Sequence, residues 1–167
     1  MTNSCLRWTL CVALALMGCD KSTSTETPAA GGGASATVPT FVNSGDIVRG
    51  KTQAVGKCRL CHQIDGSGGK MGEPIDARLL KKVELLLTEY PKHIETMKLT
   101  KPDLYQASAA RFEAIVAATD MEQKLGLWLT AYIPKPDFDR PKGKMNAVSM
   151  SPDALADVIA YLLSLRK

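Results

Sequence analysis

The sequence predicts an all-α domain. Apolar residues recur at helical spacing in several segments, and capping residues or prolines mark the ends of these segments. No segment shows the convincing alternation of apolar and polar residues that is typical of a strand. Hydrophobic residues make up 45% of the 167 residues, which suffices for one core of modest size. We therefore expect one helical domain with a short extension.

The two ends of the predicted domain each form a helix. The last helix has Ser151 as its N-cap, and an apolar stripe follows. The stripe consists of Leu155, Val158, Ile159, Leu162 and Leu163. The first helix starts at Ser44 or Asp46 and runs to Val55. It contains Gly50, and a glycine inside a helix often marks the close approach of another backbone.

Three further helices are expected between these two. We place them over residues 76–90, 102–119 and 120–132. Pro91 ends the first of them, and Pro134 and Pro136 follow the third. The sequence contains no internal repeat and no apolar run long enough for a transmembrane helix.

The N-terminus predicts an export signal over residues 1–18. Arg7 supplies positive charge, and residues 8–17 form an apolar run that is too short to span a bilayer. The run ends in Leu-Met-Gly-Cys19, which resembles the lipobox of bacterial lipoproteins. That resemblance implies cleavage before Cys19 and acylation of its thiol and new amine, which would anchor the protein to a membrane. An ordinary signal peptide with a chance cysteine is the alternative.

The remaining chain divides into a tether and a domain. Residues 19–41 are rich in Ser, Thr, Ala, Gly and Pro and predict a flexible linker. Residues 42–167 form the predicted domain. The whole chain has 21 basic and 17 acidic residues, a net charge of +4, with no long basic run. Nucleic acid is therefore not an expected partner.

The motif Cys58-Arg-Leu-Cys-His62 predicts a covalent attachment site for one c-type haem. Two thiols at this spacing can form thioether bonds to the two vinyl groups of one porphyrin edge. His62 is then held beneath the ring, where an imidazole nitrogen can bind the iron. Cys58 and Cys61 would thus fix the cofactor, and His62 would be its proximal ligand.

Other interpretations of the motif are weaker. A zinc site needs four ligands, and beyond this motif only His93 and no second cysteine pair is available. A thioredoxin-like site would need a surrounding βαβ pattern, which is absent. The other cysteines are Cys5, Cys11 and Cys19. They lie in the signal peptide or at the lipidation site, so no disulfide framework is expected in the domain.

The domain resembles the class I cytochromes c at both of its ends. Gly50 lies eight residues before Cys58, in a helix that leads into the haem motif. The tail from Met145 to Tyr161, with Ser-Pro-Asp opening its helix, resembles the family's methionine loop and C-terminal helix. The resemblance implies a cytochrome c-like helical domain around one covalently bound haem. It also implies that Gly50 and Tyr161 touch where the two terminal helices cross.

The resemblance assigns Met145 as the sixth ligand of the iron. A thioether is a soft, neutral ligand that favours Fe(II) and raises the potential. Met150 falls at a position that usually holds a core leucine, and His93 would give a bis-histidine haem. Both remain alternatives. The proline that usually follows the ligand methionine is Asn146 here.

Two further positions carry expectations from the resemblance. The carbonyl of Pro74 is expected to accept a hydrogen bond from His62 and to fix its tautomer. Trp128 resembles the family's aromatic residue against the haem propionates, with an ordinary core tryptophan as the alternative. Residues 75–120 have no family counterpart and are expected to form extra helices, which could cover the haem or dock onto a partner.

These features predict a monohaem c-type cytochrome that transfers single electrons between redox-partner proteins. It would be an exported, membrane-anchored lipoprotein facing the periplasm or the cell exterior. Basic residues near the motif and the methionine loop could form a rim that steers acidic partners. They are Lys57, Arg59, Lys135, Arg140, Lys142 and Lys144. The alternative is a cytochrome subunit docked permanently on a dehydrogenase or oxidase, and an enzyme is not expected.

Overall fold

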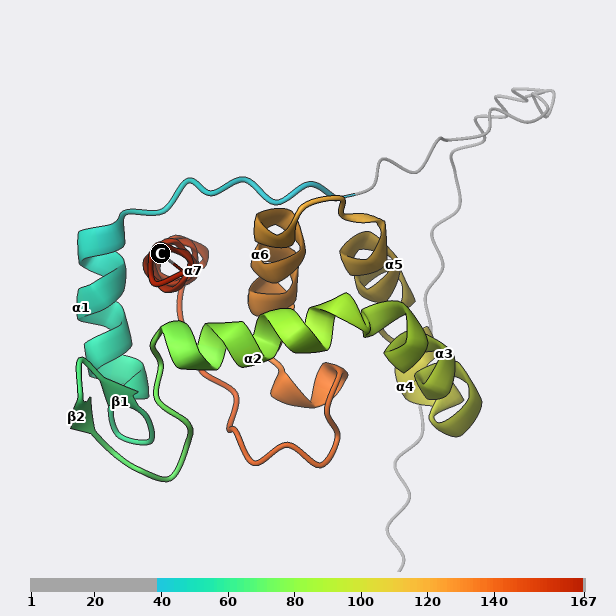
Figure 1. Cartoon of the computed structure of the whole chain (residues 1–167), viewed down its shortest axis with the longest axis horizontal. Helices are drawn as coiled ribbons and strands as arrows, with labels where there is room; N and C mark the ends of the chain where they lie inside the picture. Colours follow the sequence, from blue (N-terminus) through green and yellow to red (C-terminus); the bar gives the residue numbers. More distant parts are fainter. Residues whose placement is uncertain (1–38, 167) are drawn as a thin grey trace, which may run out of the picture. The chain divides into compact units, whose positions relative to one another are not determined.

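The structure, a computed structural model, describes residues 39–166 (Figure 1). The chain separates into two units, Met1–Ser35 and Ala36–Lys167, and the second contains all of the described residues. The predicted signal peptide and Cys19 lie outside the described residues. The helices are α1 (Ile47–Cys58), α2 (Ala77–Thr88), α3 (Tyr90–Thr100), α4 (Pro102–Gln106), α5 (Ala109–Ala117), α6 (Met121–Tyr132) and α7 (Pro152–Ser164). The predicted all-α class is confirmed.

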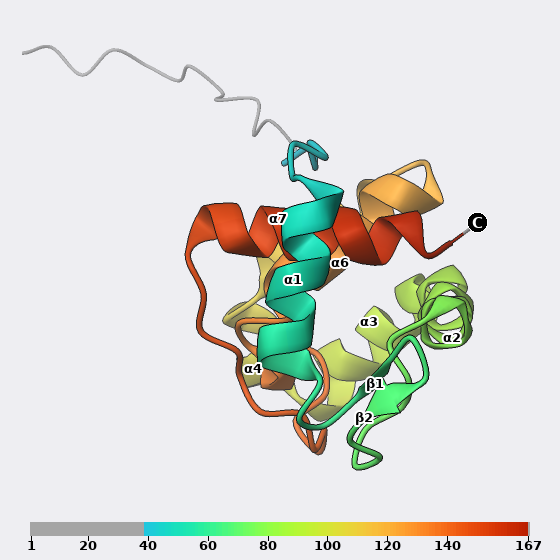
Figure 2. The same ribbon diagram turned by 90° about the vertical axis from the view of Figure 1, so that its left-hand side faces the viewer.

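The two terminal helices cross, as Figure 2 shows. Helix α1 is capped by Asp46, whose carboxylate accepts a hydrogen bond from the backbone N–H of Arg49. Gly50 is buried at the crossing, because a Cβ there would overlap the backbone carbonyl of Asp157 and lie 2.9 Å from Cβ of Tyr161. The expected contact between Gly50 and Tyr161 is thereby confirmed.

Helices α2 and α3 differ from the prediction at their junction. Asp76 caps α2, as its place before the apolar stripe indicates, and α2 ends at Thr88. Pro91 was expected to end a helix, but it lies in the first turn of α3. Proline is well tolerated there because the first N–H groups of a helix have no intrahelical acceptor. The prediction therefore missed α3.

The predicted helix over residues 102–119 is two helices in the structure. Helix α4 ends at Gln106, and α5 begins at Ala109 after the buried Ser108. Helix α6 follows and is capped by Asp120. Apolar residues continue across the break, so hydrophobic periodicity alone did not reveal it.

The core is formed mainly by α2, α3, α5, α6 and α7. Its largest fully buried side chains include Tyr90, Phe112 and Phe138, which stands in the 3₁₀ helix η1 (Pro136–Phe138). Phe41, assigned to the tether from sequence, packs against Gly126 of α6, where a side chain would overlap its ring. The domain's packing thus begins at least at Phe41.

The only strands among the described residues form a hairpin just after α1. Strand β1 (Gln63–Ile64) pairs antiparallel with β2 (Ser67–Gly68). Asp65 and Gly66 make the turn with positive φ angles of 51° and 72°. None of the described helices is long and apolar enough to cross a membrane.

Candidate haem site

The haem motif forms a tight turn at the C-terminal end of α1. Cys58 is the last residue of the helix. Its carbonyl accepts hydrogen bonds from the backbone N–H groups of Cys61 (3.1 Å) and His62 (2.9 Å). The turn brings together the three predicted residues of the motif on one short segment, which is what covalent attachment and iron ligation from one side require.

The two thiols are free and half-buried. Burial, and secondarily the neighbouring Cys61, raise the pKa of the Cys58 thiol. A thioredoxin-type nucleophile needs the opposite, a lowered pKa that exposes a reactive thiolate. The electrostatic setting of Cys58 therefore disfavours a redox-active dithiol.

His62 is oriented by the segment that follows the hairpin. The distance from its Nδ1 to the backbone carbonyl oxygen of Glu73 is 2.5 Å. A carbonyl only accepts, so Nδ1 carries the hydrogen in this pair, and Nε2 is left as the nitrogen able to bind a metal. The chain thus supplies the tautomer that an iron-ligating histidine needs.

The expected acceptor of this bond, Pro74, is one residue away from the observed one. Two backbone hydrogen bonds hold this segment beside the motif, from the N–H of Gly72 to Cys61 and from that of Ile75 to Gln63. In this register the carbonyl of Glu73, rather than that of Pro74, faces the ring.

Gly72 lies directly against the proximal imidazole, a contact that the sequence did not reveal. A Cβ at this position would overlap the His62 ring. The glycine therefore allows the segment to pass close enough for the Glu73 bond. The carbonyl of Glu73 thus holds the ring, and the lack of a Cβ at Gly72 leaves the space for this contact.

Met145 lies on a different segment, the loop between η1 and α7. Its side chain is half-buried, and the loop around it is without helix or strand. One backbone bond ties the loop to the core, from the N–H of Val148 to the carbonyl of Ile133 (3.0 Å). Met150 packs against the hydrophobic core, as expected for a residue at a core position.

His93, the alternative sixth ligand, is engaged elsewhere. It lies on α3, and its Nε2 is 2.6 Å from Oδ1 of Asp139. The same carboxylate accepts a hydrogen bond from Nε1 of Trp128 at 2.7 Å. The indole N–H that was expected near the propionates is thus directed at Asp139, and the ring itself is buried. These contacts favour a core role for Trp128 over one against the propionates.

The donor set of this site fits haem c better than another metal group. It combines two free thiols on one turn with an imidazole whose Nδ1 is already bonded. Within residues 39–166 no three His, Cys, Asp or Glu side chains gather as a metal-binding cluster. A structural zinc site needs four such ligands.

The helical fold and the Cys-x-x-Cys-His turn together define a protein that binds haem covalently. The sequence profile described as Cytochrome c matches residues 47–166. No curated protein and no solved structure gives a significant match. The profile covers well over half of the chain, so the protein belongs to the cytochrome c family. It is an electron-transfer protein that carries covalently bound haem c.

Proposed function

We propose that the protein is a monohaem electron carrier with axial ligands His62 and Met145, held at the outer face of a bacterial membrane by a lipid on Cys19. Haem c, when bound, supplies one-electron exchange between Fe(III) and Fe(II). With His62 and Met145 both as ligands, the iron would keep no open position for a substrate, so the assignment is a carrier and not an enzyme. Its partners would be redox proteins in the periplasm or at the cell exterior.

The hydrogen bond between Nδ1 of His62 and Glu73 is the observation that carries this proposal. It fixes the imidazole so that Nε2 is the free nitrogen. Cys58 and Cys61 are the thioether donors on the same turn. The protein's own backbone therefore orients the proposed proximal ligand, without help from a partner protein or a substrate.

Exposed side chains around the motif support a docking role. Leu60 and Met71 are 79% and 81% exposed, although both are large apolar residues. They come from adjacent segments, because the N–H of Gly69 bonds the carbonyl of Arg59. Exposed cations accompany them, namely Lys57, Arg59 and Lys70. An apolar centre with a basic rim suits transient contact with an acidic redox partner.

The axial ligands are tested by absorption spectra of the haem-loaded protein in its Fe(III) and Fe(II) states. We expect a weak band at the red end of the Fe(III) spectrum that disappears in Met145→Ala and survives in Met150→Ala. The second variant removes a methionine from the same loop and is the matched control. A high-spin Fe(III) spectrum of the unmodified protein, or one unchanged by Met145→Ala, would overturn the assignment.

The lipid anchor on Cys19 is tested with a variant of that residue. Cys19→Ser removes the acylated thiol and leaves the tether and the domain unchanged. We expect the unmodified mature protein to carry a mass increment from covalently bound fatty acid, and the Cys19→Ser variant to lack it. An unmodified protein without this increment would contradict lipidation.

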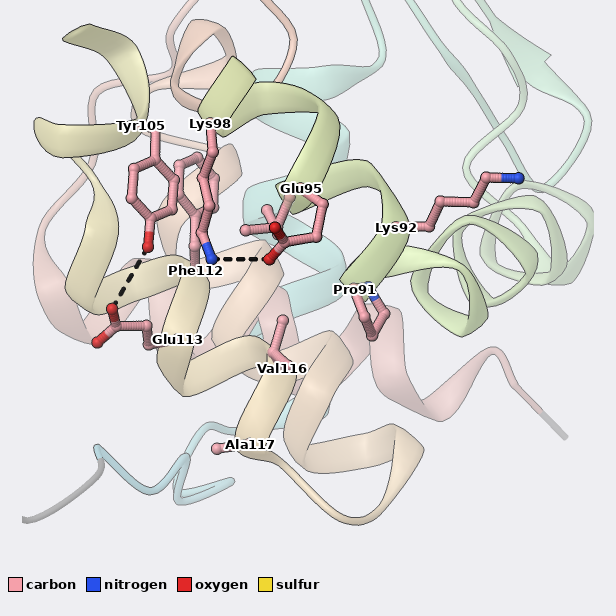
Figure 3. Close-up of a pocket in the computed structure, with 10 residues that line it drawn as sticks. Pro91, Lys92, Glu95, Lys98, Tyr105, Phe112, Glu113, Val116 and Ala117 are labelled. Carbon is pink, nitrogen blue, oxygen red and sulfur yellow. Dashed lines mark hydrogen bonds and ion pairs between the residues drawn. The ribbon is translucent and has the colours of Figure 1, made fainter. Parts of the chain in front are cut away.

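The docked-subunit alternative gains support from a groove on residues 75–120. It has a volume of about 410 Å³ and lies between α3, α4 and α5 (Figure 3). Its lining includes the apolar Ile94, Phe112 and Val116. A free carrier and a docked subunit differ in mass, so analytical ultracentrifugation of the detergent-solubilised native protein separates them. A single species with the mass of one chain without residues 1–18, plus lipid, haem and detergent, favours the carrier.

A further inference from the structure

The carboxylate of Asp139 is buried in full, with no exposed side-chain surface. An ionised carboxylate in such a place is costly unless hydrogen bonds and an opposite charge compensate it. Its two partners come from separate helices: His93 of α3 at 2.6 Å and Trp128 of α6 at 2.7 Å. One side chain thus connects two helices to the segment that follows η1.

That segment is the loop which carries Met145. Residue 139 is the last buried position before a run of exposed ones, residues 140–144. Arg140 lies over the ring of Trp128, with its guanidinium carbon 5.9 Å from the ring centroid. Farther along, the loop is tied by the Val148 bond to Ile133. Asp139 therefore anchors the start of the loop, and Val148 anchors its later part.

When it is protonated, His93 supplies the positive charge that the buried carboxylate needs. The hydrogen bond to Asp139 raises the pKa of His93, while partial burial and the nearby Arg140 oppose the rise. Trp128, the partner from α6, is neutral. Tyr90, beside His93 on α3, stays protonated because burial and Asp139 raise its pKa.

Four ionisable groups on the other helices packed against α3 have side-chain partners other than His93. Lys82 and Glu84 of α2 pair with Glu73 and Arg166. Tyr105 of α4 and Glu113 of α5 line the groove together with Lys98 and Glu95 of α3. Asp139 is thus the acidic group that faces the His93 ring, with Oδ1 2.6 Å from Nε2.

We propose that His93, Asp139 and Trp128 form a clamp that positions the start of the Met145 loop, and that protonated His93 keeps the clamp closed. The importance of the loop rests on the proposed function, in which Met145 is an iron ligand. The clamp itself consists of contacts within the protein, so its test does not depend on the haem spectrum.

The clamp predicts a pH dependence of definite sign. The pKa of His93 is raised in the folded protein, so the stabilisation is fully present below its unfolded value of 6.5. It is lost as the pH rises through the raised folded value. The loop should therefore open more often on the alkaline side of this titration, and less often on the acid side.

Hydrogen exchange in the haem-loaded protein tests the clamp. Rates of the amides in residues 140–150, corrected for the intrinsic effect of pH, should rise about tenfold between about pH 6 and about pH 9. His93→Gln keeps a donor to Asp139 but cannot titrate, and Asp139→Asn keeps an acceptor for Trp128 but removes the charge. Both variants should lose this rise in exchange rate with pH, which we call the pH step. If the three residues served packing alone, the pH step would persist in both variants.

Glu84→Gln is the matched control, because it breaks a different half-buried ion pair, with Arg166, that does not touch the loop. We expect it to keep the pH step in residues 140–150. The clamp is wrong if the loop of the unmodified protein shows no step, or if both clamp variants retain it. An equal rise throughout α1 and α7 would also count against it, because that pattern indicates global unfolding.

The same samples separate the clamp from the ligand assignment. If Met145→Ala leaves the Fe(III) spectrum unchanged while the loop shows the expected step, the ligand assignment fails and the clamp stands. If the spectrum depends on Met145 but the step is absent, the clamp fails and the proposed function stands.

Discussion

Gly50 and Gly56 lie in the same helix but have different surroundings. A Cβ at Gly50 would overlap the carbonyl of Asp157, whereas a Cβ at Gly56 would have no neighbour within 4 Å. The first glycine thus permits the crossing of α1 and α7, and the second has no packing role. Alanine substitutions at Gly50 and Gly56 therefore distinguish the cost of steric overlap from the general effect of alanine on helix stability.

We expect Gly50→Ala to lower the free energy of unfolding by about 3 kcal/mol, because backbone at the crossing must move. Gly56→Ala, the matched control, should raise it by about 0.5–1 kcal/mol through helix propensity. Denaturant unfolding of the haem-loaded protein measures both. Similar values for the two variants would show that the crossing accommodates a methyl group.

Gly72 lies against the His62 ring, where there is no room for a side chain. Gly72→Ala would drive a methyl group into the His62 ring and displace the segment that holds the Glu73 carbonyl. We expect a lower haem content per polypeptide and a weaker hold on the proximal ligand, seen as a partly high-spin Fe(III) spectrum. Gly56→Ala should have full haem content. A Gly72→Ala protein with unchanged content and spectrum would contradict the role of this contact.

The sequence predicted the site residues that lie together on one turn. It did not predict those whose roles depend on how separate segments align. Cys58, Cys61 and His62 share one turn, so their spacing predicts their placement. The acceptor for His62 was predicted one residue too far along, because the register of residues 72–75 is set by hydrogen bonds to the hairpin segment. Asp139 carries no sequence signal, since its two partners are 46 and 11 residues away.

At the scale of elements, Asp157 links the helices α1 and α7. Its buried carboxylate accepts hydrogen bonds from the backbone N–H of Asp46 at 2.7 Å and from Arg49 at 2.9 and 3.1 Å. The bond from Arg49, and then that from Asp46, lower the pKa of Asp157. The side chain caps the start of α1 from outside the helix, at the point where α7 crosses it.

This link predicts how the domain responds to acid. Because the pKa of Asp157 is lower in the folded protein, its stabilisation is present above the unfolded value of 3.8 and is lost as the pH falls through the folded value. Asp157→Asn should therefore lower the melting temperature at neutral pH and by less at about pH 2. Asp153→Asn, on the same helix, is the control. An equal loss at both pH values would contradict the link.

The helices themselves were predictable where caps and apolar stripes agree. Asp46, Asp76, Asp120 and Ser151 all cap helices, as their places before apolar runs indicate. Helix α3 was missed because Pro91 is compatible both with the end of one helix and with the first turn of the next. Tertiary packing decides whether Pro91 ends one helix or begins the next, and local sequence patterns do not reveal this packing.

At the scale of the whole molecule, the charge is modest and its placement matters more than its sum. The chain carries a net charge of +4. Lys57 and Lys70 are exposed near the haem motif, whereas Lys92 and Lys101 are exposed at the two ends of α3. Figure 1 shows α3 and the hairpin at opposite sides of the helical unit. Replacing both lysines of either pair by glutamate reduces the net charge from +4 to zero, so the two variants differ only in location.

We expect the rate of oxidation of the haem by an anionic reagent to fall as ionic strength rises, and the rate with a cationic reagent to rise. Lys57→Glu with Lys70→Glu should slow the anionic reaction severalfold at low salt, because these exposed cations lie near the haem motif. Lys92→Glu with Lys101→Glu should change it much less. Stopped-flow kinetics measure both. Equal slowing by the two pairs would mean that net charge, and not a basic rim at the motif, steers the reaction.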